Sequence, residues 1–77
     1  MELAEKINFV SMPPLLSQDR FAQLIGKETK TIRSWVTTRA IPTVKVGGSR
    51  MVNIEQLRQD LLAGKRSFVA GDYKFNN

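Results

Sequence analysis

The stretch that decides the fold is Gln18–Arg50, which reads QDRFAQLIGKETKTIRSWVTTRAIPTVKVGGSR. Apolar residues recur at helical spacing on both sides of Gly26, and after Pro42 they alternate with polar residues. Gly26 can take the left-handed conformation that ends a helix, whereas Pro42 cannot continue one. The pattern therefore predicts two short helices followed by strands.

The two predicted helices run from Gln18 to about Ile25 and from Glu28 to about Thr38. Ser17 is expected to cap the first helix, because its hydroxyl can accept a hydrogen bond from a free N–H in the first turn. The apolar residues on the inner faces of the two helices are expected to form the core; they are Phe21, Leu24, Ile25, Ile32, Trp35 and Val36.

A β-hairpin is predicted next, from the alternation in Thr43–Val46 and Ser49–Val52. The two runs are joined by Gly47-Gly48, a two-residue turn in which both residues can adopt positive φ. We expect Val44 and Val46 to share one face of the hairpin. Thr43, Lys45 and Arg50 are expected on the side that faces water or near the tip.

A third helix is predicted from Ile54 to about Ala63, with Asn53 as its N-cap and Gly64 as its terminator. Gln56, three residues after Asn53, can complete an amide version of the capping box. The apolar stripe of this helix is expected to comprise Ile54, Leu57 and Leu61, with Leu62 at its margin.

The predicted fold class is mainly α with a small β-hairpin, arranged as a winged helix-turn-helix over residues 17–64. An N-terminal arm, residues 1–16, precedes it, and residues 7–10 could form a short strand or an apolar arm. A C-terminal tail, residues 65–77, follows. Its aromatic residues Phe68, Tyr73 and Phe75 either mediate oligomerisation or fold back onto their own domain.

The charge of the chain is concentrated in one stretch. The 77 residues hold 12 Lys and Arg and 7 Asp and Glu, which gives a net charge of +5. Between Lys27 and Arg50 the only acidic residue is Glu28, and the basic residues are Lys27, Lys30, Arg33, Arg39, Lys45 and Arg50. The local balance of +5 therefore equals that of the whole chain, and it points to nucleic acid ahead of a membrane surface.

Composition also excludes several classes of function. The chain has no cysteine and no histidine, so it lacks disulfides, Cys/His zinc sites and the usual general base. We expect no enzyme activity, no cofactor and no metal. The start lacks the pattern of a signal peptide, and no run of about 18 apolar residues occurs, so a cytoplasmic protein is expected.

In a helix-turn-helix, the second helix lies across the major groove and its N-terminal residues face the base edges. Lys30 and Arg33 are the long donors suited to guanine or to phosphate. The candidate DNA-binding residues of this recognition helix are Lys27, Thr29, Lys30, Arg33, Ser34 and Thr37. Those of the hairpin, as a wing, are Lys45, Gly47, Gly48, Ser49 and Arg50. Arg39 is a weaker candidate, because its helical phase could place it against Asp19 or a neighbouring loop.

The run FAQLIGKETKTIRSW at Phe21–Trp35, followed by Ala40-Ile41-Pro42, resembles the MerR-type winged-helix pattern. In particular it is similar to the small excisionase-regulators of P2-like temperate phages, the Cox and Apl proteins, over roughly residues 15–64. The resemblance implies binding to repeated DNA sites, oligomerisation along DNA, DNA bending and repression of a phage promoter. It also implies a phage integrase, a tyrosine recombinase, as partner, and a location in the host bacterial cell in association with the nucleoid.

Two alternatives remain open at this point. The chain could be a plain transcriptional regulator without a role in recombination, or a protein-binding anti-repressor that uses the same fold. A single small module covers about 600–1,000 Å² of DNA-binding surface, so a specific DNA-binding function would need several copies side by side.

Overall fold

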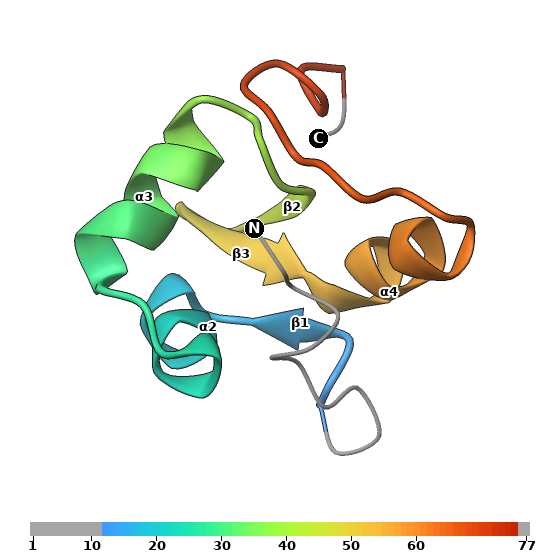
Figure 1. Ribbon diagram of the computed structural model, residues 1–77. Coiled ribbons are helices and arrows are strands. Elements are labelled where there is room, and N and C mark those ends of the chain that lie inside the picture. Colours follow the sequence, from blue (N-terminus) through green and yellow to red (C-terminus); the bar gives the residue numbers. More distant parts are fainter. Residues whose placement is uncertain (1–11, 76–77) are drawn as a thin grey trace.

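The computed structural model describes residues 12–75, so the possible strand at residues 7–10 lies outside the described part. The elements, in order, are β1 (Leu15–Leu16), α2 (Gln18–Ile25), α3 (Thr29–Thr37), β2 (Thr43–Val46), β3 (Ser49–Asn53) and α4 (Ile54–Leu62) (Figure 1). The described part is thus a mixed α/β fold of three helices and a three-stranded sheet. No helix within it is long and apolar enough to cross a membrane.

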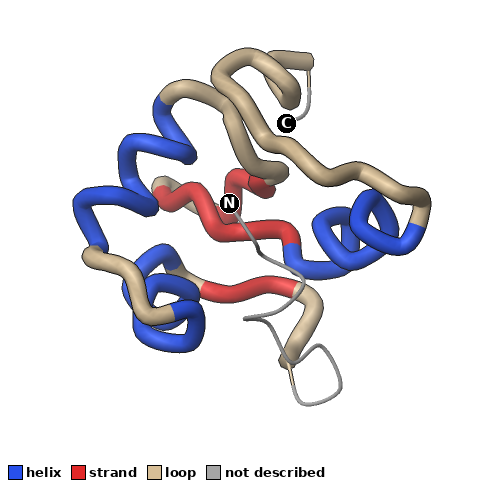
Figure 2. The backbone as a smooth tube through the Cα atoms, viewed as in Figure 1, coloured by secondary structure: helices blue, strands red, loops and turns tan. Residues whose placement is uncertain are grey.

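The sheet is antiparallel throughout, with β3 in the middle and β1 and β2 on either side of it (Figure 2). Leu16 and Thr43 lie opposite Val52 from the two neighbouring strands. The predicted class, mainly α with a small hairpin, is therefore wrong in one respect, because Leu15 and Leu16 add a third strand. The sequence placed them in the N-terminal arm, since a strand of two residues shows no alternation.

The predicted helix ends are confirmed for α2. The N–H of Arg20 donates to the Ser17 hydroxyl over 3.1 Å, and Gly26 has a φ of 74° at the C-terminal end. Local chemistry alone thus fixes both limits of this helix, because the cap and the terminator act on backbone groups within one turn.

The capping of α4 is confirmed in part. The N–H of Gln56 donates to the Asn53 side chain over 3.0 Å. The expected return bond, from the Asn53 N–H to the Gln56 side chain, is absent, and the side-chain N–H of Gln56 donates to Asp60 over 2.8 Å. Asn53 is also the last residue of β3, and its own N–H already donates to the carbonyl of Pro42. The Gln56 amide is therefore free to stabilise the next turn of α4.

The core lies where the helices meet the sheet. Its buried apolar residues include Leu16, Phe21, Ala22, Ile25, Ile32, Val36, Ile41, Val52, Ile54 and Leu57, and Trp35 and Leu61 pack against them. Two predictions are wrong: Leu24 is 38% exposed, and Leu62 lies on the surface. The residues of α2 that face the core are Phe21, Ala22 and Ile25, so Ala22 is buried and Leu24 lies outside the buried stripe.

The expected exposure of Thr43 in the hairpin is also wrong. Thr43 is buried, with 1% of its surface exposed, whereas Val46 is exposed. The register explains this, because Thr43 lies opposite the fully buried Val52 and shares its face. Lys45 and Arg50 follow on that same face nearer the tip. The guanidinium of Arg50 donates to the Thr43 hydroxyl over 3.1 Å, which gives this buried hydroxyl a partner.

The C-terminal segment up to residue 75 contains turns but no helix or strand, and it packs on the domain (Figure 2). Tyr73 is buried, and Phe68 packs against the core, with the two ring centroids 6.4 Å apart. Asp72 accepts a hydrogen bond from Lys65 over 2.8 Å. Of the three aromatic residues of the tail, only Phe75 projects freely, with 90% of its surface exposed.

Candidate nucleic-acid interface

Helix α3 is held against α2 by a short connection, residues 26–28. The N–H of Lys27 donates to the carbonyl of Ala22 over 2.9 Å, which closes the end of α2. The buried Ile32 and Val36 then turn one face of α3 to the core. Since the inner face is fixed by burial, the opposite face of α3 is presented to solvent.

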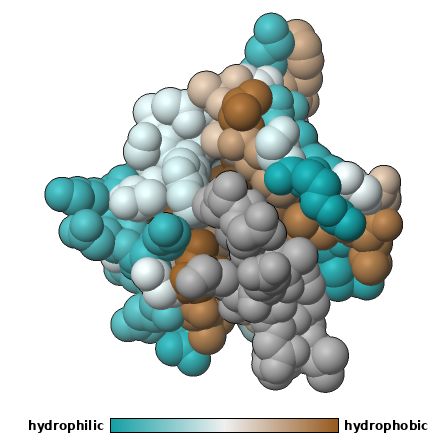
Figure 3. All heavy atoms as spheres, viewed as in Figure 1, coloured by the Kyte–Doolittle hydropathy of each residue, from teal (hydrophilic) through white to brown (hydrophobic). Residues whose placement is uncertain are grey.

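The solvent face of α3 holds the residues predicted for the recognition helix. Lys27, Lys30, Arg33, Ser34 and Thr37 are exposed, and Thr29 is half-buried. Hydrophilic residues accordingly cover this side of the molecule, seen at the left of Figure 3. The ammonium of Lys30 lies 3.9 Å from the Glu28 carboxylate, but both side chains are largely exposed, so this pair stabilises little.

The start of α3 leaves backbone donors without a side-chain cap. Glu28 occupies the N-cap position with an extended backbone, yet its side chain makes no capping hydrogen bond. The N-terminus of a helix carries a partial positive charge, which favours an anion such as a phosphate. The exposed Lys27 lies immediately before this end and adds a full positive charge.

The tip of the β2–β3 hairpin is also exposed. Lys45, Gly47, Gly48 and Ser49 lie at the surface, and Arg50 is half-buried through its bond to Thr43. Gly47 has a φ of 60°, whereas Gly48 does not have a positive φ. A positive φ at the first turn position alone is the pattern of a type II′ turn, whose twist matches that of the flanking strands.

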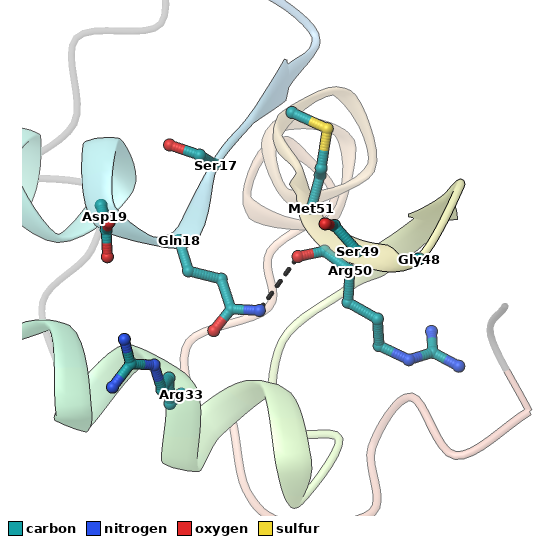
Figure 4. A pocket seen from close by; sticks show the side chains of 8 residues that line it. All are labelled: Ser17, Gln18, Asp19, Arg33, Gly48, Ser49, Arg50 and Met51. Atoms are coloured by element: carbon teal, nitrogen blue, oxygen red, sulfur yellow. Dashed lines mark hydrogen bonds between the residues drawn. The ribbon is translucent and has the colours of Figure 1, made fainter.

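Helix α3 and the hairpin tip meet at an open hollow of about 480 Å³ beside the start of α2 (Figure 4). It is lined by Ser17, Gln18, Asp19, Arg33, Gly48, Ser49, Arg50 and Met51. The side-chain amide of Gln18 donates to the carbonyl of Arg50 over 2.9 Å and so fixes β3 to α2. The structure thus brings Arg33 of the predicted helix set together with Gly48, Ser49 and Arg50 of the hairpin set.

A comparison with known proteins gives a match to a bacteriophage protein. No protein-family model matches the chain, and no solved structure matches it. The "10.1 kDa protein" of Pseudomonas phage Pf1 is 44% identical over an alignment of 72 residues, and the match covers 90% of this chain and 80% of that protein. The chain belongs to this bacteriophage family.

Membership of this phage family confirms the phage origin that the sequence resemblance implied. The relative's name states a mass and no partner. No family model links the chain to the Cox and Apl type, so that finer assignment is not shown.

Four residues of the hollow were missing from the predicted site: Ser17, Gln18, Asp19 and Met51. Gln18 bonds to β3 across 32 positions of sequence, a contact that no local pattern reveals. Asp19 adds a carboxylate to a hollow that also holds Arg33 and Arg50. Its position in the first turn of α2 was predictable, but its proximity to the hairpin was not. Within residues 12–75, no cluster of three or more Asp, Glu, His or Cys residues could hold a metal ion.

Proposed function

We propose that this phage protein binds double-stranded DNA in a sequence-specific manner, with α3 as recognition helix and the β2–β3 hairpin as wing of a winged helix-turn-helix. The observation that carries the proposal is that Arg33 and the hairpin tip line one open hollow. The surrounding charge supports it. Among the basic residues of positions 27–50, only Lys30 forms an ion pair within the described part of the chain.

The proposed binding mode follows from the two surfaces. The N-terminal half of α3 enters the major groove, where Arg33 can pair with guanine through its planar fork of donors. Lys27 and the uncapped start of α3 contact a phosphate. The hairpin tip lies on the flanking strand, where Lys45 contacts phosphate and Ser49 reaches the minor-groove edge.

The proposed biological role is that of a phage excisionase and transcriptional repressor. A module of this size reads few base pairs, so several copies would bind repeated sites cooperatively and bend the DNA. A phage tyrosine recombinase would be the protein partner. Phage membership and the sequence resemblance support this role, and a plain regulator without a recombination partner is the nearest alternative.

Charge reversal tests the DNA-binding proposal. The double variant Lys30→Glu, Arg33→Glu should abolish retention of duplex DNA in a gel-shift assay, because it converts two proposed contacts into repulsive ones. A matched control is Arg66→Glu, Lys74→Glu, which makes the same charge change on exposed residues of the tail. A protein-binding anti-repressor would tolerate the first pair as well as the second, and equal DNA retention by both would overturn the proposal.

The excisionase role needs a separate experiment. Footprinting on the DNA that flanks the chain's own gene should show regularly spaced protected repeats. A circular-permutation gel assay should show bending, and adding the cognate integrase should shift its reaction towards excision. Protected repeats with straight DNA and no effect on the integrase would leave a plain repressor.

A further inference from the structure

All three helices of the described chain end in the same backbone motif. The residue after the last turn is left-handed: Gly26 after α2, Gly64 after α4 and Arg39 after α3, with φ values of 74°, 104° and 61°. The next N–H then closes the helix end by donating to a carbonyl five residues back: Lys27 to Ala22, Lys65 to Asp60 and Ala40 to Trp35, at 2.9, 3.0 and 2.9 Å. This is the Schellman motif, for which glycine is the usual residue.

Arg39 is the exception in this set. In the left-handed conformation, the Cβ of any residue except glycine crowds a neighbouring carbonyl oxygen. Arg39 is the only described residue other than glycine with a positive φ. Since the chain places glycine at the two equivalent positions, the arginine at the third is a strained choice that the fold does not need.

The surrounding backbone holds this strained turn firmly. The N–H of Arg39 donates to the carbonyl of Val36 over 3.2 Å, and its own carbonyl accepts from the N–H of Tyr73 over 2.9 Å. The carbonyl of Thr38 accepts from Gly71 over 2.8 Å. Two of these bonds use backbone atoms of position 39 and the third uses the carbonyl of Thr38, so a glycine at position 39 would leave all three in place.

The Arg39 side chain is half-buried but has no polar partner among the described residues. Within residues 12–75, its guanidinium donates no hydrogen bond and pairs with no carboxylate. A cation would complement the C-terminal dipole of α3. A basic residue in place of Thr37 or Thr38 could do so without strain, yet the last turn of α3 holds no basic residue.

We infer that Arg39 is a DNA-backbone contact, and that its guanidinium binds a phosphate at the far wall of the groove entered by α3. This inference rests on the proposed DNA-binding function. A helix of nine residues is about 13 Å long, and the major groove is about 12 Å wide. If α3 crosses the groove, a residue just beyond its end lies about one groove width from its start, beside the opposite strand. Guanidinium matches phosphate oxygens in a two-pronged geometry, which lysine cannot reproduce.

The decisive variant is Arg39→Gly, which relieves the strain and removes the charge. Its midpoint of unfolding should stay the same or rise, while its affinity for duplex DNA should fall about tenfold on cognate and unrelated sequences alike. The slope of log affinity against log salt should become shallower by about 1. Arg39→Asn, which also tolerates the left-handed conformation, should reproduce the loss of affinity. Arg39→Lys should keep most of the salt slope with weaker binding.

Arg66→Gly is the matched control, since it removes an exposed arginine of the tail, and Arg33→Gln tests the proposed function separately. If Arg33→Gln loses DNA binding while both Arg39→Gly and Arg39→Asn retain affinity and salt slope, this inference is overturned and the proposed function stands. If Arg33→Gln and both Arg39 variants all bind as well as the native protein, the proposed function and this inference both fail. Marked unfolding of both Arg39 variants would show a structural role for the side chain and would also overturn the inference.

Discussion

The backbone N–H of Tyr73 donates to the carbonyl oxygen of Arg39 over 2.9 Å, which ties the C-terminal tail to the turn that ends α3. The hydroxyl of the same tyrosine donates to the carboxylate of Asp60 on α4. Tyr73 thus connects the end of the proposed recognition helix to the third helix. The tail therefore packs as part of the domain, and it contacts the turn that ends α3.

Shortening Tyr73 should destabilise the fold. Tyr73→Phe loses the hydroxyl bond to Asp60 and should lower the free energy of unfolding by about 1–2 kcal/mol. Tyr73→Ala also loses the buried ring that stacks on Phe68 and should cost about 3 kcal/mol or more. Denaturant unfolding followed by the fluorescence of Trp35, the chain's only tryptophan, measures both. Phe75→Ala serves as control and should change stability by less than about 0.5 kcal/mol. Equal stability of Tyr73→Ala and the native protein would show that the tail is dispensable for folding.

The same tyrosine should make stability fall at alkaline pH. Burial, and then the hydrogen bond to Asp60, raise the pKa of Tyr73 well above its ordinary value. An unfolded tyrosine ionises near about pH 10, so the native state binds the proton more tightly than the unfolded state. The contribution of Tyr73 to stability is therefore complete below about pH 10 and is lost progressively as the pH rises above that value.

This titration can be followed directly, because Tyr73 is the only tyrosine of the chain. Its ultraviolet absorbance should show no tyrosinate near pH 10 while the protein is folded, and ionisation should accompany unfolding. The stability difference between the native protein and Tyr73→Phe should shrink over the same pH range. A normal tyrosine titration in the folded protein would contradict the buried hydrogen bond.

The fold was predictable where the signals are local. Ser17, Gly26 and Pro42 act on backbone groups within one turn, so the limits of α2 and of the hairpin followed from sequence. Strand β1 did not, because two residues show no period and their partners lie on β3, more than 30 positions away. The burial of Thr43 did not follow from the sequence either. Alternation defines two faces of a hairpin, but the position of the core against Val52 decides which of them is buried.

The candidate site was predictable to a similar extent. Helical phase identified the outer face of α3, because Ile32 and Val36 have to be buried. The meeting of Arg33 with the hairpin tip depends on tertiary packing, including the bond from Gln18 to Arg50. The conformation of Arg39 escaped prediction as well, since its spacing from Trp35 made it look like one more residue of the helix.

The structure of the tail reduces the three aromatic candidates for self-association to one. Phe68 and Tyr73 are packed within one copy, so Phe75 is the aromatic residue left for a neighbouring copy. Phe75→Ser should lower cooperativity on a site with several repeats about tenfold, a typical cost for losing one aromatic anchor of an interface. Binding to a single repeat should be unchanged. Gel-shift titrations of one-repeat and multi-repeat duplexes separate the two effects.

A matched control for Phe75→Ser is Leu62→Ala, which removes another exposed apolar side chain from a different part of the surface. Cooperativity that survives Phe75→Ser, or that falls equally with Leu62→Ala, would rule out a specific role for the aromatic ring.

The salt dependence of DNA binding should report the number of phosphates contacted. If one copy contacts about 4–6 phosphates, log affinity should fall against log salt with a slope of roughly −4 to −5, because each contact releases condensed counterions. Replacing Lys27 or Lys45 by Gln should make the slope shallower by about 1 on every sequence.

Arg33→Gln should instead reduce the preference for the cognate site, since a base contact adds discrimination of about 1–3 kcal/mol. Fluorescence anisotropy of labelled duplexes over a series of salt concentrations measures both quantities, with Lys74→Gln as the control that should leave them unchanged. A native slope near zero would mean that phosphate contacts do not dominate, and the basic surface of α3 and the hairpin would then need another ligand.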